Sequence, residues 1–318
     1  MSTPARSSLA DLAAPLERYP LAREAALAAL AFGVLQVAVA VSSAVGAPLA
    51  GAMRDVASPL ADTGPEHLVV SALASTVVVA GGLTVAAVAY VRVRDLSVPL
   101  ALPGRGDLPL VAAALAGPAL ALVVAALVGD LTGTPFYELS GSRSTPGAAV
   151  HVSAVITLLG LALGLPAYLL LAHVIVQPTL RTASDGVTAA GLTTLFVALI
   201  GPTSLVRPGP LRAFAVPVLL ALAIALPACA AHWYDHRWLT AVAAVPLALV
   251  LAGGVHDRVV GVAGPAGALY AGGEVLVVAL GSVGVARTDS VVPAAVAFTS
   301  CSATSAALSY VTSAGLPS

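Results

Sequence analysis

The sequence predicts an all-α fold, a polytopic bundle of about nine transmembrane helices with a range of eight to ten. Of the 318 residues, 59% are hydrophobic and only 9% are charged, whereas a soluble domain is about 25% charged. The mean hydropathy is +0.99. The apolar residues gather in stretches of about 20, the length of helix that crosses a bilayer. The same figures exclude a disordered chain, and the net charge of -1 leaves no basic surface for nucleic acid.

Nine stretches separated by charged or Pro- and Gly-rich connectors are the expected spans. In order they are 25–49, 68–91, 109–128, 152–176, 187–206, 213–231, 239–255, 264–286 and 291–312. Because lipid offers no hydrogen-bond partners, each stretch must pair its backbone N–H and C=O groups within itself, which favours a helix. The glycines between the seventh and eighth stretches would also allow a re-entrant turn or a broken helix. We therefore expect a cytoplasmic tail over 1–24, one transmembrane domain over 25–312, and a C-terminal tail over 313–318.

The arginines predict the orientation. Across successive connectors they divide 9 against 5 in favour of the side that holds the N-terminus. Because cytoplasmic loops are enriched in Lys and Arg, the N-terminus is expected in the cytoplasm and the protein in the cell membrane. No G-x-x-x-x-G-K-[ST] loop occurs, so the chain carries no P-loop nucleotide site.

One ionisable residue, Glu274, lies well inside an expected span, where a charge costs a few kcal/mol. Tyr270 precedes it by one helical turn, and Gly272 and Gly273 between them would let another helix approach closely. A protonated Glu274, hydrogen-bonded across a helix interface, is one interpretation. A proton- or ion-handling carboxylate is the other, and a re-entrant segment with a hydrated Glu274 is a third.

A second polar group, His232, Asp235 and His236, follows the sixth stretch. Two histidines at i and i+4 share one helix face and can bind zinc, although a site needs further ligands. His256 is the nearest candidate, but about 20 helical residues would hold it roughly 30 Å from His236. The alternative is an interfacial belt with Trp233, Tyr234 and Trp238. His173, in the fourth stretch, is expected to be a packing or interfacial residue.

The last third of the chain, about 213–312, resembles the CPBP family of intramembrane metalloproteases, related to the CAAX prenyl proteases and the bacteriocin-processing Abi proteins. The connector 287–293 (RTDSVVP) is similar to the family's Arg-Thr-x-Ser/Asn-Leu-x-x-Pro, and 252–256 (AGGVH) keeps only the histidine of its F-x-x-x-H motif. The family's E-E-x-x-x-R would fall on 223–228 and its H-x-x-x-N/D on 297–301. Neither segment contains an ionisable ligand other than Cys301.

The resemblance implies a catalytically inactive relative without a cofactor, since the family's chemistry needs glutamates and histidines to hold a metal. We expect a non-enzymatic membrane protein that binds a peptide, a lipid or a membrane-protein partner. A small-solute transporter or channel component using Glu274 and the Ser/Thr-rich segment 299–305 is the alternative. An active intramembrane metalloprotease with a site built from His232, Asp235 and His236 is the second alternative.

Overall fold

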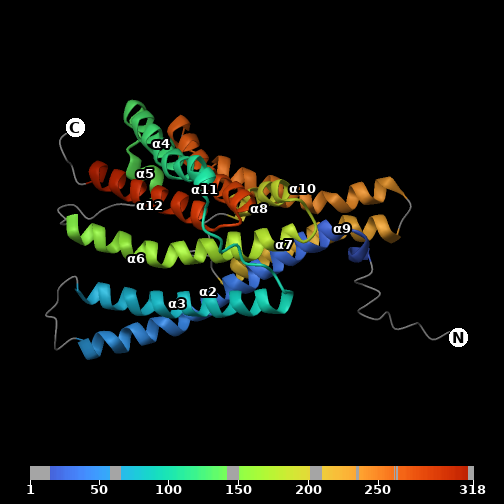
Figure 1. Ribbon diagram of the computed structural model, residues 1–318, viewed down its shortest axis with the longest axis horizontal. Coiled ribbons are helices and arrows are strands. Elements are labelled where there is room, and N and C mark those ends of the chain that lie inside the picture. Colours follow the sequence, from blue (N-terminus) through green and yellow to red (C-terminus); the bar gives the residue numbers. More distant parts are fainter. Residues whose placement is uncertain are drawn as a thin grey trace.

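The computed structural model describes residues 15–57, 66–141, 150–200, 210–233, 236–260, 262 and 264–313. In this part of the chain the regular elements are all helical, which confirms the predicted all-α class (Figure 1). Strand-like pairing in the same residues is limited to an isolated bridge between Leu100 and Ser290. Because the long helices hydrogen-bond their own backbones, their apolar side chains are free to face lipid.

Eight helical stretches of the described chain are long and apolar enough to cross a membrane. They lie in α2 (Pro20–Ala57), α3 (Glu66–Arg94), α4 (Leu108–Thr132), α6 to α7 (Val150–Arg181), α9 (Pro210–Trp233), α10 (Arg237–Val260), α11 (Gly264–Thr288) and α12 (Val292–Ser313). The number is within the predicted range. It confirms a multi-pass protein whose environment is a lipid bilayer.

The fifth expected span, 187–206, corresponds to the shorter helix α8 (Gly186–Ile200). Its 15 residues extend about 22 Å, less than the roughly 30 Å of a bilayer core. Positions 201–206 of that stretch lie outside the described residues. Within the described chain, α8 is a shorter apolar helix packed on α11, and the residues that would complete the predicted span lie outside the described part.

One continuous helix forms the centre of the bundle. It runs through α6 (Val150–Tyr168), the π-helix η2 (Leu169–Val176) and α7 (Gln177–Arg181). Residues 171–180 are all buried. On one side, Leu171 and Ile175 pack with α2, α8 and α9, and on the other, Tyr168 and Ala172 pack with α4, α11 and α12. This central helix therefore packs between two groups of helices, which also contact each other directly through α8 and α11.

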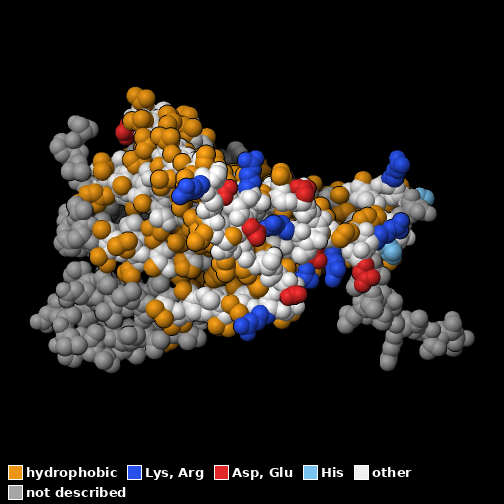
Figure 2. All heavy atoms as spheres, in the orientation of Figure 1, with side chains coloured by type: hydrophobic (Ala, Val, Ile, Leu, Met, Phe, Trp, Pro, Cys, Tyr) orange, Lys and Arg blue, Asp and Glu red, His pale blue; other side chains and the backbone are white. Residues whose placement is uncertain are grey.

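Charged side chains gather where α3 ends and α4 begins, while hydrophobic side chains cover the visible parts of α4, α6 and α12 (Figure 2). The connector after α3 pairs with the connector before α12: the Val291 N–H donates to the Pro99 carbonyl at 2.9 Å. Arg181 at the end of α7 forms an ion pair with Asp289, with 2.9 Å between guanidinium and carboxylate. Three connectors distant in sequence thus meet at one end of the bundle.

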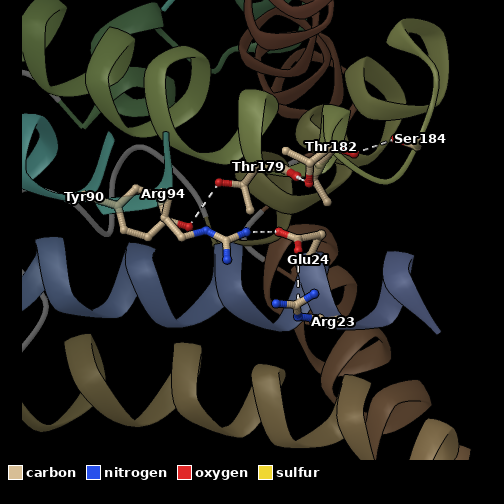
Figure 3. A network of polar contacts seen from close by, with 8 residues as sticks. Arg23, Glu24, Tyr90, Arg94, Thr179, Thr182 and Ser184 are labelled. Carbon is tan, nitrogen blue, oxygen red and sulfur yellow. Dashed lines mark hydrogen bonds and ion pairs between the residues drawn. The ribbon is translucent and has the colours of Figure 1, made fainter. Parts of the chain in front are cut away.

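A buried ion pair lies near the same end. Glu24 of α2, with 8% of its side chain exposed, binds the guanidinium of Arg94 at the end of α3 (Figure 3). Beside it, Tyr90 and Thr179 share a hydrogen bond of 3.1 Å between α3 and α7. The sequence predicts that this helix starts at residue 25. In the structure α2 begins at Pro20, so Glu24 lies inside the helix. The carboxylate is tolerated at this depth because a cation from the neighbouring helix reaches it.

Candidate functional site

A buried polar group lies in the central helix. Tyr168, His173 and Gln177 are 3%, 0% and 0% exposed. They surround the π-helix η2, in which the Gln177 N–H donates to the carbonyl of Ala172, five residues earlier. Pro178, which has no N–H and cannot continue an α-helical hydrogen-bond ladder, follows directly. π segments inside α-helices are rare and frequently occur at functional sites.

The three side chains form one hydrogen-bonded chain. The Tyr168 hydroxyl lies 2.9 Å from His173 Nε2, and His173 Nδ1 lies 2.9 Å from Gln177 Oε1. The Gln177 amide nitrogen donates to the carbonyl of Ser282 in α11 at 2.7 Å. The π geometry makes this possible, because an i to i+5 turn brings residues 168 and 173 to the same side of the helix.

This arrangement determines where the protons lie. The bond from the Gln177 amide to Ser282 turns the glutamine oxygen toward His173, so His173 Nδ1 must be the donor. A neutral imidazole then accepts at Nε2 from the Tyr168 hydroxyl at 2.9 Å, and the carbonyl of Val277, at 3.4 Å, is the more distant second acceptor for that hydroxyl. An imidazolium here would be a buried charge without a carboxylate in contact, which is costly. His173 is therefore neutral, and both of its ring nitrogens are already occupied.

Helices α11 and α12 pack closely on this group. The rings of Tyr168 and Phe298 of α12 stack at 4.9 Å with an angle of 16°. Gly281 of α11 allows the approach, since a Cβ there would lie 2.8 Å from the Tyr168 hydroxyl and 3.0 Å from His173 Nε2. The buried hydroxyl of Ser282 has no hydrogen-bond partner in the described chain. The group is thus enclosed on every described side by packed helices.

Glu274 lies apart from this cluster, in the first half of α11. It is half-buried, and its carboxyl group shares a hydrogen bond with Tyr270, which also bonds to Ser305 of α12. The Tyr270 ring packs against Phe136 at 5.7 Å. The hydrogen bond between Glu274 and Tyr270 lies within α11, one helical turn apart, and the contact to α12 is made by Tyr270 through Ser305.

The predicted histidine cluster is at the surface. His232 in the last turn of α9 and His236 before α10 are exposed, and Asp235 lies outside the described residues. His256 is exposed near the other end of α10. In the described residues, no three His, Cys, Asp or Glu side chains lie close enough to hold a metal ion. The structure therefore brings none of these histidines into the cluster around His173.

Sequence reasoning missed Tyr168 and Gln177, and it assigned His173 to a packing or interfacial role. A usable signal was present: three hydrogen-bonding side chains at intervals of five and four residues, followed by Pro178, within an apolar span. The interval of five is uninformative in an α-helix. The interval of five becomes informative only if Pro178 is read as a sign that the backbone departs from α geometry before it.

The fold and this cluster define the class of the protein, an all-α, multi-pass membrane protein with a closed polar centre. Comparisons of the chain with protein-family models, curated proteins and solved structures gave no match. The fold, the polar cluster and the comparisons therefore classify the protein by its fold class.

Proposed function

We propose that this protein is a non-catalytic multi-pass protein of the cell membrane, with a binding or scaffolding role, on a scaffold related to the CPBP family. The observation that carries the proposal is the state of His173. Metal-dependent hydrolysis needs ligands with free lone pairs and a bound water. His173 instead uses Nε2 for Tyr168 and Nδ1 for Gln177. The polar centre is arranged as a structural support and not as a metal site.

We propose, besides segment 223–228, a second position for the family's degenerate motif. Segment 223–228 lies on α9, which packs mainly on α2 and α10. Tyr168, Leu169 and His173 have the spacing of E-E-x-x-x-R, and Tyr168 contacts Phe298 in the helix that follows the RTDSVVP connector. Under this proposal, tyrosine and leucine replace the paired glutamates, and phenylalanine occupies the place of the closing histidine.

The cytoplasmic orientation of the N-terminus is part of the same proposal. Two ion pairs support the grouping of connectors on which it rests. Glu24 joins Arg94, and Arg181 joins Asp289. All four residues belong to the connectors that the arginine distribution assigns to the side of the N-terminus. A reporter fused to the N-terminus tests it, and exposure of that reporter outside the cell would overturn the assignment.

Metal content and peptide cleavage test the absence of catalysis. Purified protein, reconstituted in liposomes with added zinc and then dialysed, should retain far less than one zinc per chain. It should also leave a prenylated peptide uncut. A His173→Gln variant serves as the control, because residual metal from the surface histidines would be the same in both proteins. Stoichiometric zinc and cleavage that both disappear in His173→Gln would overturn the proposal.

Solute transport is the second candidate, and Glu274 is the observation behind it. A half-buried carboxyl group in a span, with Tyr270 and Ser305 around it, is a chemistry that proton-coupled transporters use. The test is proton flux into liposomes loaded with a pH-sensitive dye. Flux that is present in the unaltered protein and lost in Glu274→Gln supports transport. Equal flux in both proteins and in empty liposomes removes this candidate.

A further inference from the structure

A large apolar cavity lies away from the polar cluster, between the start of α2 and helices α8, α9 and α10. Its volume is about 710 Å³, and it is partly open to the exterior of the bundle. Ligand sites commonly have volumes of about 300–1,000 Å³. The walls are formed almost entirely by aliphatic side chains, prolines and Phe196. A cavity of this kind excludes a polar solute and suits a hydrocarbon chain.

The polar lining is confined to one end of the cavity. Only Arg18 and Thr240 contribute charged or aliphatic hydroxyl side chains, with the phenol of Tyr19 beside them. Arg18 precedes α2, Thr240 lies in the first turn of α10, and Ala231 lies in the last turn of α9. These helix ends meet at the same side of the cavity. Leu220 and Leu251 line it further along the helices, so the cavity runs from a cationic mouth to an apolar interior.

Arg18 is available to an anion. It is exposed, and in the described part of the chain no ion pair occupies it. Its neighbour Glu17 is exposed and does not line the cavity. Arginine binds phosphate oxygens through its planar fork of N–H groups. Basic pockets between transmembrane helices are known as sites for lipid head groups.

We propose that this cavity binds one acyl chain of an anionic phospholipid from the surrounding bilayer, with the lipid phosphate held by Arg18. A phospholipid is the occupant because its charge and hydrocarbon match the two ends of the cavity. The apolar surface of the protein also places it among such molecules. This inference rests on the proposed function, for which it names the ligand class. The lipid-binding inference can fail while the proposed function stands, and the reverse, because metal content and peptide cleavage do not depend on lipid.

Native mass spectrometry of delipidated protein in detergent, titrated with phosphatidylglycerol or phosphatidylcholine, tests the inference. One tight phosphatidylglycerol should bind per chain, and phosphatidylcholine should bind more weakly. Arg18→Gln should weaken phosphatidylglycerol binding by about fivefold, since a basic residue near a membrane surface contributes roughly that factor. The matched control Arg105→Gln removes one exposed positive charge before α4, away from the cavity, and should leave binding unchanged.

Two variants fill the cavity from different walls. Leu195→Trp, at a position 49% exposed, and Ala231→Trp should each abolish the tight site. Thermal unfolding of each variant shows whether it is folded. If one of the two variants does not fold, the result is taken from the other. Equal loss of binding in Arg18→Gln and Arg105→Gln would overturn the proposal, as would undiminished binding in a folded filled variant. A dimer that the filled variants dissociate would also overturn it, because the occupant would then be a second copy of the chain.

Discussion

The substitution Gly281→Ala measures how tightly α11 is packed on the polar cluster. The added Cβ would lie 2.8 Å from the Tyr168 hydroxyl and 3.0 Å from both His173 Nε2 and the Cβ of Ala294. Ordinary contacts begin at 3.4 Å, so the hydroxyl alone must retreat by about 0.6 Å. Overpacking of this kind costs about 1–3 kcal/mol. Alanine in place of glycine in a helix recovers about 0.5–1 kcal/mol, leaving a net loss of up to about 2.5 kcal/mol and a deficit of about 1–3 kcal/mol relative to a glycine replaced without a clash.

Gly272→Ala is the matched control, because it changes the same residue type in the same helix. Gly272 is exposed, and a Cβ there meets nothing within 4 Å. Only the helix-propensity gain should remain, so we expect unchanged or slightly higher stability. Unfolding by dodecyl sulfate in mixed micelles, followed by circular dichroism, gives the free energy for each variant. Similar stability for Gly281→Ala and Gly272→Ala would refute the close approach and the hydrogen-bonded cluster derived from it.

Three further predictions concern buried and surface polar groups. Gln177→Leu leaves the imidazole N–H and one backbone carbonyl without their partners, and should lower the unfolding free energy by about 2–4 kcal/mol in the same assay. Arg94→Gln leaves the buried Glu24 carboxylate with only the 4.0 Å contact to the exposed Arg23 and should cost up to about 3 kcal/mol. Glu24→Gln in the same chain should restore part of this loss, and no restoration would refute the ion pair. Hydrogen bonds from the Thr188 side chain and N–H lower the pKa of Asp185 below its ordinary value of 3.8. Its contribution to stability is therefore present above that value and lost as the pH falls through the lower, folded-state pKa. Asp185→Ala should remove this part of the pH dependence of Tm, which lies below about pH 4.

Hydropathy alone predicted the helical spans well, because the requirement for a self-satisfied backbone leaves helix as the solution for long apolar stretches. The start of α2 shows where this reasoning stops. In the sequence, Glu24 lies directly before the apolar stretch 25–49 and so marks its N-terminal boundary. In the structure, the helix begins at Pro20 and buries the Glu24 carboxylate. The compensating cation, Arg94, is far away in the chain. Ion pairs between distant segments leave no local pattern, so the boundary could not be found from hydropathy.

The cluster around His173 was missed for a reason of helix geometry. In an α-helix, residues five apart are turned by about 140° from one another, so Tyr168 and His173 would not be expected to meet. The eight-residue π-helix η2 removes that separation and creates the 2.9 Å contact. Glu274 was found because a carboxyl group in a span is conspicuous in any backbone geometry. Sequence reasoning thus found the residue whose free-energy cost in the membrane is the same in any backbone conformation.

The π-helix also sets the rotational phase between the two ends of the central helix. A π turn holds more residues than an α turn, so the eight residues Leu169–Val176 rotate the chain by about as much as seven α-helical residues would. Removing one of them would let the backbone return to α geometry while Gln177 still faces Ser282 and Arg181 still faces Asp289. The segment therefore acts as the place where this helix holds one additional residue. A single-residue deletion here should be less damaging than the same deletion in the α-helical part of α6, where no change of helix type can absorb the turn of about 100°.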